Sequence, residues 1–140
     1  MSVGAVLLLA LSLGLLAAVG GPAVSHAGGT LLAAHRGGAQ LRPENSLLAF
    51  RNAIALGADF LEFDVHLARD GEVVVIHDPT LERTTRGAGA VSDRSLGDLK
   101  ALRLKDRDGK VTDEGVPTLD DAVQLAAPTP VRLLDRKSVV

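Results

Sequence analysis

The segment FLEFDVHLARDGEVVVIHD, residues 60–78, contains the pattern that decides the fold of this chain. Its first half alternates between apolar and ionisable residues, which is typical of a β-strand whose side chains point in turn to two faces. The apolar members are Leu61, Phe63, Val65 and Leu67, and the ionisable members are Glu62, Asp64 and His66. We therefore expect one face to pack on helices and the other to carry two carboxylates and an imidazole into one space.

The two carboxylates on this strand are costly to place together. At a separation of about 5 Å and an effective dielectric constant of about 20, two ionised carboxylates repel each other by roughly 3 kcal/mol. A sheltered site must therefore hold a proton or a cation between Glu62 and Asp64. Oxygen ligands favour a hard cation, Ca²⁺, Mg²⁺ or Mn²⁺, over zinc.

Length and composition limit the classes of protein to which the chain can belong. With 140 residues it has room for one domain or for part of a larger one. It contains no cysteine, which excludes disulfides and thiolate metal sites, and its net charge of −2 gives no electrostatic basis for binding nucleic acid or an anionic membrane. Three Phe without Trp or Tyr leave little surface for stacking bases or sugar rings.

Residues 1–27 have the composition of a targeting segment. Residues 1–19 contain no charged side chain and include an apolar run of about 14 residues, and Ser25 and Ala27 form a small-residue cleavage pattern. We expect a secretory signal peptide, with an uncleaved membrane anchor and a buried core helix as the alternatives. The chain would then be exported to the periplasm or the extracellular space, or be anchored in the membrane through this segment alone.

Upstream of the central segment, the sequence predicts a strand followed by a helix. Residues 30–35 form a short apolar run that ends in His35 and Arg36, with two glycines behind them. A cap at Asn45 or Ser46 then begins a helix of about ten residues. A strand, a helix and the strand that begins at residue 60 form a βαβ unit, which implies parallel strands.

A second set of functional side chains follows the turn at the end of the central strand. The β-branched run from Val73 to Ile76 predicts a buried strand that delivers His77 and Asp78 at its end. We therefore expect His35 and His77 at the ends of strands that flank the carboxylate strand.

Further along the chain the pattern predicts loops and two helices. Residues 81–90 and 103–110 are polar and contain glycine, which is typical of surface loops. Ser92 or Asp93 is expected to cap a short helix, and Thr118 to cap a later one.

Two histidines, an arginine and a pair of metal-binding carboxylates suit attack at a phosphate. One imidazole would remove the proton of the nucleophile, the other would protonate the leaving oxygen, and Arg36 and the cation would offset the developing charge. A glycosidase also uses two carboxylates, but these flank the scissile bond from separate elements. Glu62 and Asp64 instead lie two residues apart on one strand, which argues against a glycosidase.

Taken together, the motifs of the chain resemble the glycerophosphodiester phosphodiesterase family. They are HRGG at 35–38, PENS at 43–46, FLEFDV at 60–65, VVIHDPTLERTT at 74–85 and VPTL at 116–119. The match runs from about residue 32 to residue 125, with the motifs in the family's order. The resemblance implies an α/β fold, a (β/α)8 TIM barrel with its site at the carboxyl ends of the strands. It also implies metal-dependent hydrolysis of glycerophosphodiesters to an alcohol and glycerol 3-phosphate.

The resemblance assigns roles to individual residues of this chain. The acid and base pair would be His35 and His77, the substrate-binding residues Arg36, Glu44 and Asn45, and the metal ligands Glu62 and Asp64. The metal would be Ca²⁺ or Mg²⁺, and the partner a small-molecule glycerophosphodiester. Because His66 falls at a variable position, we expect it at the rim of the site rather than among the ligands.

The end of the chain departs from the family's pattern. Family members carry a later Glu-x-Lys that supplies a third metal ligand, where this chain has Asp135, Arg136 and Lys137. Residues 135–140 read DRKSVV, which one reading frame of a common sequencing-library adapter would encode, so we expect a non-native tail. Residues 30–134 would then be the N-terminal portion of the domain, with the first three to four barrel strands, and we expect this fragment not to form a stable active enzyme.

Two other functions stay open at this point. One is a phospholipase of the sphingomyelinase D type, which would share the histidines and the metal carboxylates. The other is a non-catalytic barrel protein that binds phosphodiesters, against which the intact set of histidines, arginine and carboxylates argues. Comparing a choline phospholipid with glycerophosphocholine as the substrate would separate the two enzymes.

Overall fold

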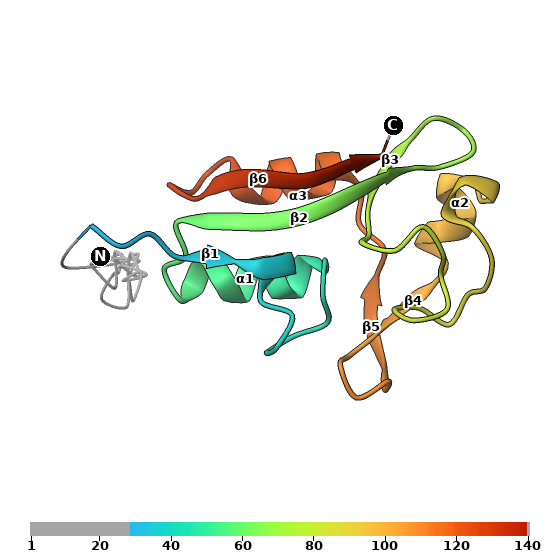
Figure 1. Cartoon of the computed structure of the whole chain (residues 1–140), viewed down its shortest axis with the longest axis horizontal. Helices are drawn as coiled ribbons and strands as arrows, with labels where there is room; N and C mark the ends of the chain where they lie inside the picture. Colours follow the sequence, from blue (N-terminus) through green and yellow to red (C-terminus); the bar gives the residue numbers. More distant parts are fainter. Residues whose placement is uncertain (1–28, 140) are drawn as a thin grey trace, which may run out of the picture.

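A long central strand, β2 (Phe60–Leu67), organises the sheet in the computed structural model, which describes residues 29–139. It pairs in parallel with β1 (Ala33–Ala34) and with β6 (Arg132–Val139), and antiparallel with β3 (Val73–Val75). Because β6 follows one edge of β2 along most of its length, β1 and β3 both lie along the other edge. Figure 1 shows β1 and β6 on opposite sides of β2.

Two helices connect the parallel strands and cover one face of the sheet (Figure 1). They are α1 (Leu47–Ala55), between β1 and β2, and α3 (Leu119–Ala126), before β6. The Phe50 ring of α1 meets the Phe63 ring of β2 edge to face, with 6.2 Å between the ring centroids. The alternation in the sequence is confirmed, since the odd-numbered residues Leu61, Phe63 and Val65 lie in this helix-side core.

Local hydrogen bonds fix where α1 begins. Ser46 is its N-cap, and the Ser46 Oγ accepts from the backbone N–H of Ala49 at 3.0 Å. The same hydroxyl donates to the Pro43 carbonyl at 2.7 Å. The turn that precedes the helix is thereby tied to its first residues, as the sequence predicts for a cap at Asn45 or Ser46.

Between β3 and α3 the chain makes an excursion with its own small elements. These are η2 (Val91–Asp93), α2 (Leu96–Lys100), β4 (Arg103–Lys105) and β5 (Val111–Gly115). The excursion packs with residues of the sheet region in a second apolar core, which contains Ala68, Val74, Ile76, Leu81, Val91, Leu99, Leu104 and Val116. It returns to the sheet beside its starting point, because the Val75 N–H donates to the Pro117 carbonyl at 2.8 Å.

Residues 103–110 are not the plain surface loop that the sequence predicts. Residues 103–105 form β4, which pairs antiparallel with β5. A tight turn joins the two strands, since Asp106 accepts through Oδ1 from the backbone N–H groups of Asp108 at 3.0 Å and Lys110 at 2.9 Å. Gly109 adopts a φ of 81°, which glycine tolerates best.

The predicted cap of the short helix is also shifted. Ser95, and not Ser92 or Asp93, caps α2, and it forms a capping box with Asp98. Ser92 and Asp93 belong instead to the single 3-10 turn η2. The later cap at Thr118 is confirmed.

The fold is α/β with an open sheet in the part of the chain that the structure describes. Strands β1, β2 and β6 are parallel and the helices lie on one face, the arrangement of the first strands of a (β/α)8 barrel that the sequence predicts. Among residues 29–139, no helix has the length and apolar character needed to cross a bilayer. The expected targeting segment, residues 1–27, lies outside the described residues.

Candidate active site

Glu62 and Asp64 lie on the face of β2 opposite the helix-side core, and both are buried, with 5% and 1% of their surface exposed. Glu62 Oε2 accepts from the backbone N–H of Arg36 at 2.6 Å, whereas Glu62 Oε1 is buried without a hydrogen-bond partner. Asp64 Oδ2 lies 3.5 Å from Asn45 Nδ2 and 3.8 Å from Arg36 Nε. The predicted pair of carboxylates therefore shares one sheltered space.

The turn after β1 brings Arg36 to these carboxylates. Arg36 has a φ of 47°, in the left-handed region, and its carbonyl accepts from the Asn45 N–H at 2.9 Å. Arg36 Nη1 donates to Glu44 Oε1 at 3.0 Å. The three predicted substrate-binding residues, Arg36, Glu44 and Asn45, are thus held together. His35 beside them is exposed.

His77 reaches the same region from β3. The Ile76 N–H donates to the Asp64 carbonyl at 3.0 Å, which places the following residue next to the middle of β2. The His77 Nδ1 lies 2.6 Å from Asp78 Oδ1. The two predicted catalytic histidines therefore approach along one edge of β2 from opposite directions, and not from its two sides.

Arg83 is a site residue that the sequence analysis missed. Its guanidinium donates to Asp78 at 2.6 and 2.9 Å and to Glu44 at 2.8 Å through each of two nitrogens. The polar loop in which it lies gave it no role. The signal that could have found it is the motif VVIHDPTLERTT at 74–85, which contains Arg83.

The contacts of Arg83 set the ionisation of both carboxylates. Hydrogen bonding to Arg83, with smaller effects of His77, holds the pKa of Asp78 well below its ordinary range. Burial acts to raise the pKa of Glu44, but the hydrogen bonds and charges of Arg83 and Arg36 outweigh it, so this pKa is also lowered. Both carboxylates are therefore ionised at neutral pH.

His66 is not the rim residue that the sequence predicts. It is 7% exposed, and its Nε2 lies 3.1 Å from the His77 carbonyl, to which it can donate. Its imidazole therefore supports the backbone that carries His77.

Strand β6 brings Arg136 to the site. Its register pairs Asp135 with Phe63, whose side chain lies in the helix-side core, and Arg136 is the extra residue at the bulge that follows. Arg136 Nη1 lies 3.9 Å from Glu62 Oε1 and 3.4 Å from His35 Nε2. The β6 side chain beside Glu62 is therefore the cation Arg136.

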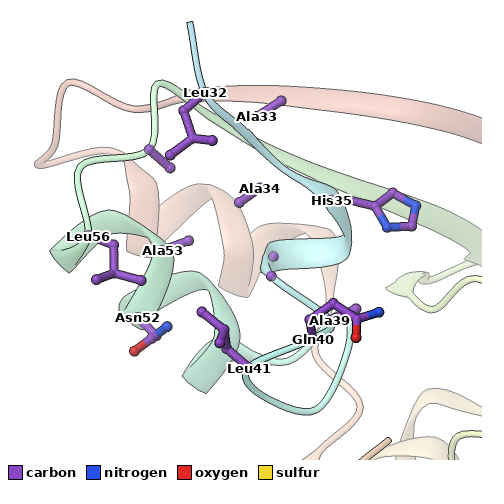
Figure 2. A pocket seen from close by; sticks show the side chains of 13 residues that line it. Leu32, Ala33, Ala34, His35, Ala39, Gln40, Leu41, Asn52, Ala53 and Leu56 are labelled. Carbon is purple, nitrogen blue, oxygen red and sulfur yellow. The ribbon is translucent and has the colours of Figure 1, made fainter. Parts of the chain in front are cut away.

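Two pockets border this region. A polar pocket of about 180 Å³ lies beside Glu44 and Arg83, and Thr84, Lys105 and Arg107 also line it. A larger apolar pocket of about 280 Å³ lies between β1 and α1. Figure 2 shows that the imidazole of His35 points away from Leu56 and Ala53 of this apolar pocket. His35 is among the residues that line this pocket, whereas Glu62 and Asp64 are not.

Known proteins with similar sequences belong to one family. The profile of the Glycerophosphoryl diester phosphodiesterase family matches residues 35–135. A glycerophosphodiester phosphodiesterase of Caldanaerobacter subterraneus subsp. tengcongensis is 46% identical over 97 residues, a match that covers 69% of this chain and 40% of that protein. One from Bacillus subtilis is 37% identical over 138 residues, covering 92% and 46%. The chain thus spans less than half the length of these relatives.

Solved structures agree with the sequence matches. A glycerophosphoryl diester phosphodiesterase from Parabacteroides distasonis superposes with a TM-score of 0.71 at 40% identity, covering 79% of this chain and 39% of that one. An Oleispira antarctica phosphodiesterase, solved in complex with the product sn-glycerol-3-phosphate, gives a TM-score of 0.70 at 32% identity, covering 78% and 44%. The similarity therefore extends to the arrangement of the backbone.

Proposed function

Because this chain belongs to the glycerophosphoryl diester phosphodiesterase family, we propose that it contributes the phosphodiester-cleaving site of an enzyme that hydrolyses glycerophosphodiesters to an alcohol and glycerol 3-phosphate. One observation carries this proposal: two strand ends converge on the middle of β2 and bring His35, Arg36 and His77 to the carboxylates Glu62 and Asp64. The product bound to the Oleispira antarctica relative supports the same substrate class.

In this hydrolysis, Arg36 binds the substrate and the two histidines transfer protons. Arg36 binds the phosphate through its guanidinium. One of His35 and His77 takes a proton from the attacking water as its oxygen bonds to phosphorus, and the other gives a proton to the alcohol oxygen as its bond to phosphorus breaks. Because Asp78 lies against the Nδ1 of His77, we assign the proton transfer of His77 to its Nε2.

The carboxylates fit a divalent cation. Glu62 Oε1 is buried without a hydrogen-bond partner, and its ion pair with Arg136 Nη1 is long, at 3.9 Å, so the atom still lacks a close ligand. Glu62 and Asp64 would hold the ion, either Ca²⁺ or Mg²⁺, although residues 29–139 contain no cluster of three or more acidic or histidine side chains arranged around one point. When bound, the cation would supply positive charge that offsets the charge developing on the phosphate oxygens.

The activity test uses two proteins in parallel. The 140-residue chain and a chimera, in which residues 35–134 replace the matching segment of the Caldanaerobacter relative, are assayed for release of glycerol 3-phosphate from glycerophosphocholine. We expect the chimera to hydrolyse the substrate in the presence of Ca²⁺ or Mg²⁺. An inactive chimera beside an active parent, with both proteins folded, would contradict the proposal.

Substitution of either histidine tests the proton chemistry. We expect His35→Ala and His77→Ala each to lower kcat of the chimera by about 10²–10⁴-fold, because each removes one proton-transfer step. The control is Glu72→Gln, which changes an exposed residue of the same sheet region. A rate within a few-fold of the parent in either histidine variant would refute the assigned roles.

Metal binding can be tested without turnover. We expect Glu62→Gln and Asp64→Asn to weaken Ca²⁺ or Mg²⁺ binding in isothermal titration calorimetry, because each removes one anionic ligand. Glu72→Gln again serves as the control, and equal affinity in all variants would exclude these ligands.

A further inference from the structure

Arg83 stands at the centre of a chain of alternating charges that crosses the site. On one side it holds Glu44, which accepts from Arg36 Nη1 at 3.0 Å. On the other side it holds Asp78, whose Oδ1 lies 2.6 Å from His77 Nδ1. The order along the chain of contacts is Arg36, Glu44, Arg83, Asp78 and His77.

The contacts of Arg83 join two segments that are far apart in the sequence. Glu44 belongs to the turn before α1, and Arg83 follows it by 39 residues in the loop after β3. Each carboxylate is gripped by two donors of one planar guanidinium, an arrangement that fixes direction as well as distance. A shift of either segment would therefore break at least two hydrogen bonds.

We propose that Arg83 is a positioning residue, which holds the phosphate-binding Arg36 and the proton-transferring His77 in register through Glu44 and Asp78. This inference rests on the proposed phosphodiesterase function. Arg83 acts through its neighbours, and the groups that contact the substrate are Arg36 and His77.

The proton chemistry of His77 depends on the contact between Arg83 and Asp78. A carboxylate fixed at Nδ1 keeps the proton of a neutral imidazole on that nitrogen and leaves Nε2 free to accept one. Without Arg83, Asp78 and Glu44 would lose their shared cation and could turn toward water. His77 would then exchange between its two tautomers, and only one of them suits proton transfer at Nε2.

If Arg83 had a purely structural role, its substitution would mainly lower the thermal stability of the chain. The side chain is 48% exposed, and ion pairs at exposed positions add little to folding stability. We therefore expect substitution of Arg83 to change the geometry of the site much more than it changes the thermal stability of the chain.

The experiment compares Arg83→Gln and Arg83→Lys with a matched control, Arg86→Gln. Arg86 is exposed in the same loop, so its substitution makes the same change of charge without touching the carboxylates. The first measurement is the tautomer of the neutral His77 imidazole by long-range ¹H–¹⁵N correlation. The variants are made in the chimera, and the signals are assigned with its His77→Gln variant.

We expect the Nδ1–H tautomer in the parent and in Arg86→Gln, and a mixture of both tautomers in Arg83→Gln. In the chimera, Arg83→Gln should lower kcat by about 10- to 100-fold, the cost of small misplacement of reacting groups, with a smaller change in KM. Arg83→Lys should recover only part of the rate, because an ammonium cannot grip two carboxylates with paired donors.

An unchanged tautomer of His77 in folded Arg83→Gln overturns the inference, whatever the rate. If Arg83→Gln fails to fold, Arg83→Lys decides, and a parental tautomer and rate in that variant also overturn it. If the parent chimera has no activity, the proposed function fails, and the tautomer comparison still decides whether Arg83 positions His77.

Discussion

Gly37 is required in the turn after β1 by packing as well as by backbone conformation. Its φ is +74°, and a Cβ at this position would lie 2.5 Å from the ring of Phe50 and 3.1 Å from the Cβ of Ala49. Real Cβ atoms do not come within 2.5 Å of other atoms, so the Phe50 ring or α1 would have to move. The glycine therefore lets α1 pack directly under the turn that carries His35 and Arg36.

Gly37→Ala should lower the free energy of unfolding by about 2–5 kcal/mol, the sum of overpacking and left-handed strain. The matched control is Gly38→Ala, because Gly38 has a φ of +97° but open space around it, and we expect about 1–2 kcal/mol there. Urea denaturation followed by far-UV circular dichroism suits a chain without Trp or Tyr. Equal losses in the two variants would exclude the packing explanation.

Single residues of the site differ in how far the sequence could predict them. Glu62 and Asp64 were predictable because strand alternation placed them on one face, and their burial confirms that face. Arg83 was not predictable in this way, since its contacts join residues 39 positions apart and follow from loop conformation. His66 was misplaced because a variable position in a motif says nothing about burial.

At the scale of elements, strongly patterned segments were predictable and short ones were not. The helix after Ser46 and the strand β2 follow clear periodicities, and both are present. The hairpin of β4 and β5 was missed because its strands of three and five residues are rich in charge and carry no alternation. Its stability comes from the Asp106 turn and from Leu104 in the second core.

The start of α1 provides a test at this scale. Ser46→Ala should lower the free energy of unfolding by about 0.5–2 kcal/mol, because the Ala49 N–H and the Pro43 carbonyl both lose their partner. Ser92→Ala is the control, since Ser92 is exposed and is not a helix cap. A loss in Ser92→Ala as large as in Ser46→Ala would show that the cap is not the cause.

At the scale of the whole molecule, Arg83 ties the excursion after β3 to the turn before α1. The ion pairs of Arg83 need ionised carboxylates, and the pKa values of Glu44 and Asp78 are both lowered in the folded chain. A lowered pKa adds stability above the unfolded value and loses it as the pH falls, because the unfolded chain then binds protons that the folded chain does not.

Acidification should therefore reduce the advantage of the parent chain over Arg83→Gln. We expect the difference between their free energies of unfolding to be largest near pH 6–7 and to shrink as the pH falls from about 5 to 3, where unfolded Asp and Glu take up protons. Urea titrations at several pH values measure this difference. If this difference in free energy is constant, or grows toward low pH, the ion pairs of Arg83 with Glu44 and Asp78 do not contribute to stability as we expect.

The hydrogen bond between the Val75 N–H and the Pro117 carbonyl holds the two ends of residues 76–116 side by side. We call these residues the cassette. A segment whose ends are adjacent can change length or sequence without moving β2, because the distance between its two ends at the sheet stays the same. The cassette also supplies Lys105 and Arg107 to the polar pocket beside Glu44. Exchanging residues 86–116 between relatives would thus change one wall of that pocket while β2, with Glu62 and Asp64, keeps its place.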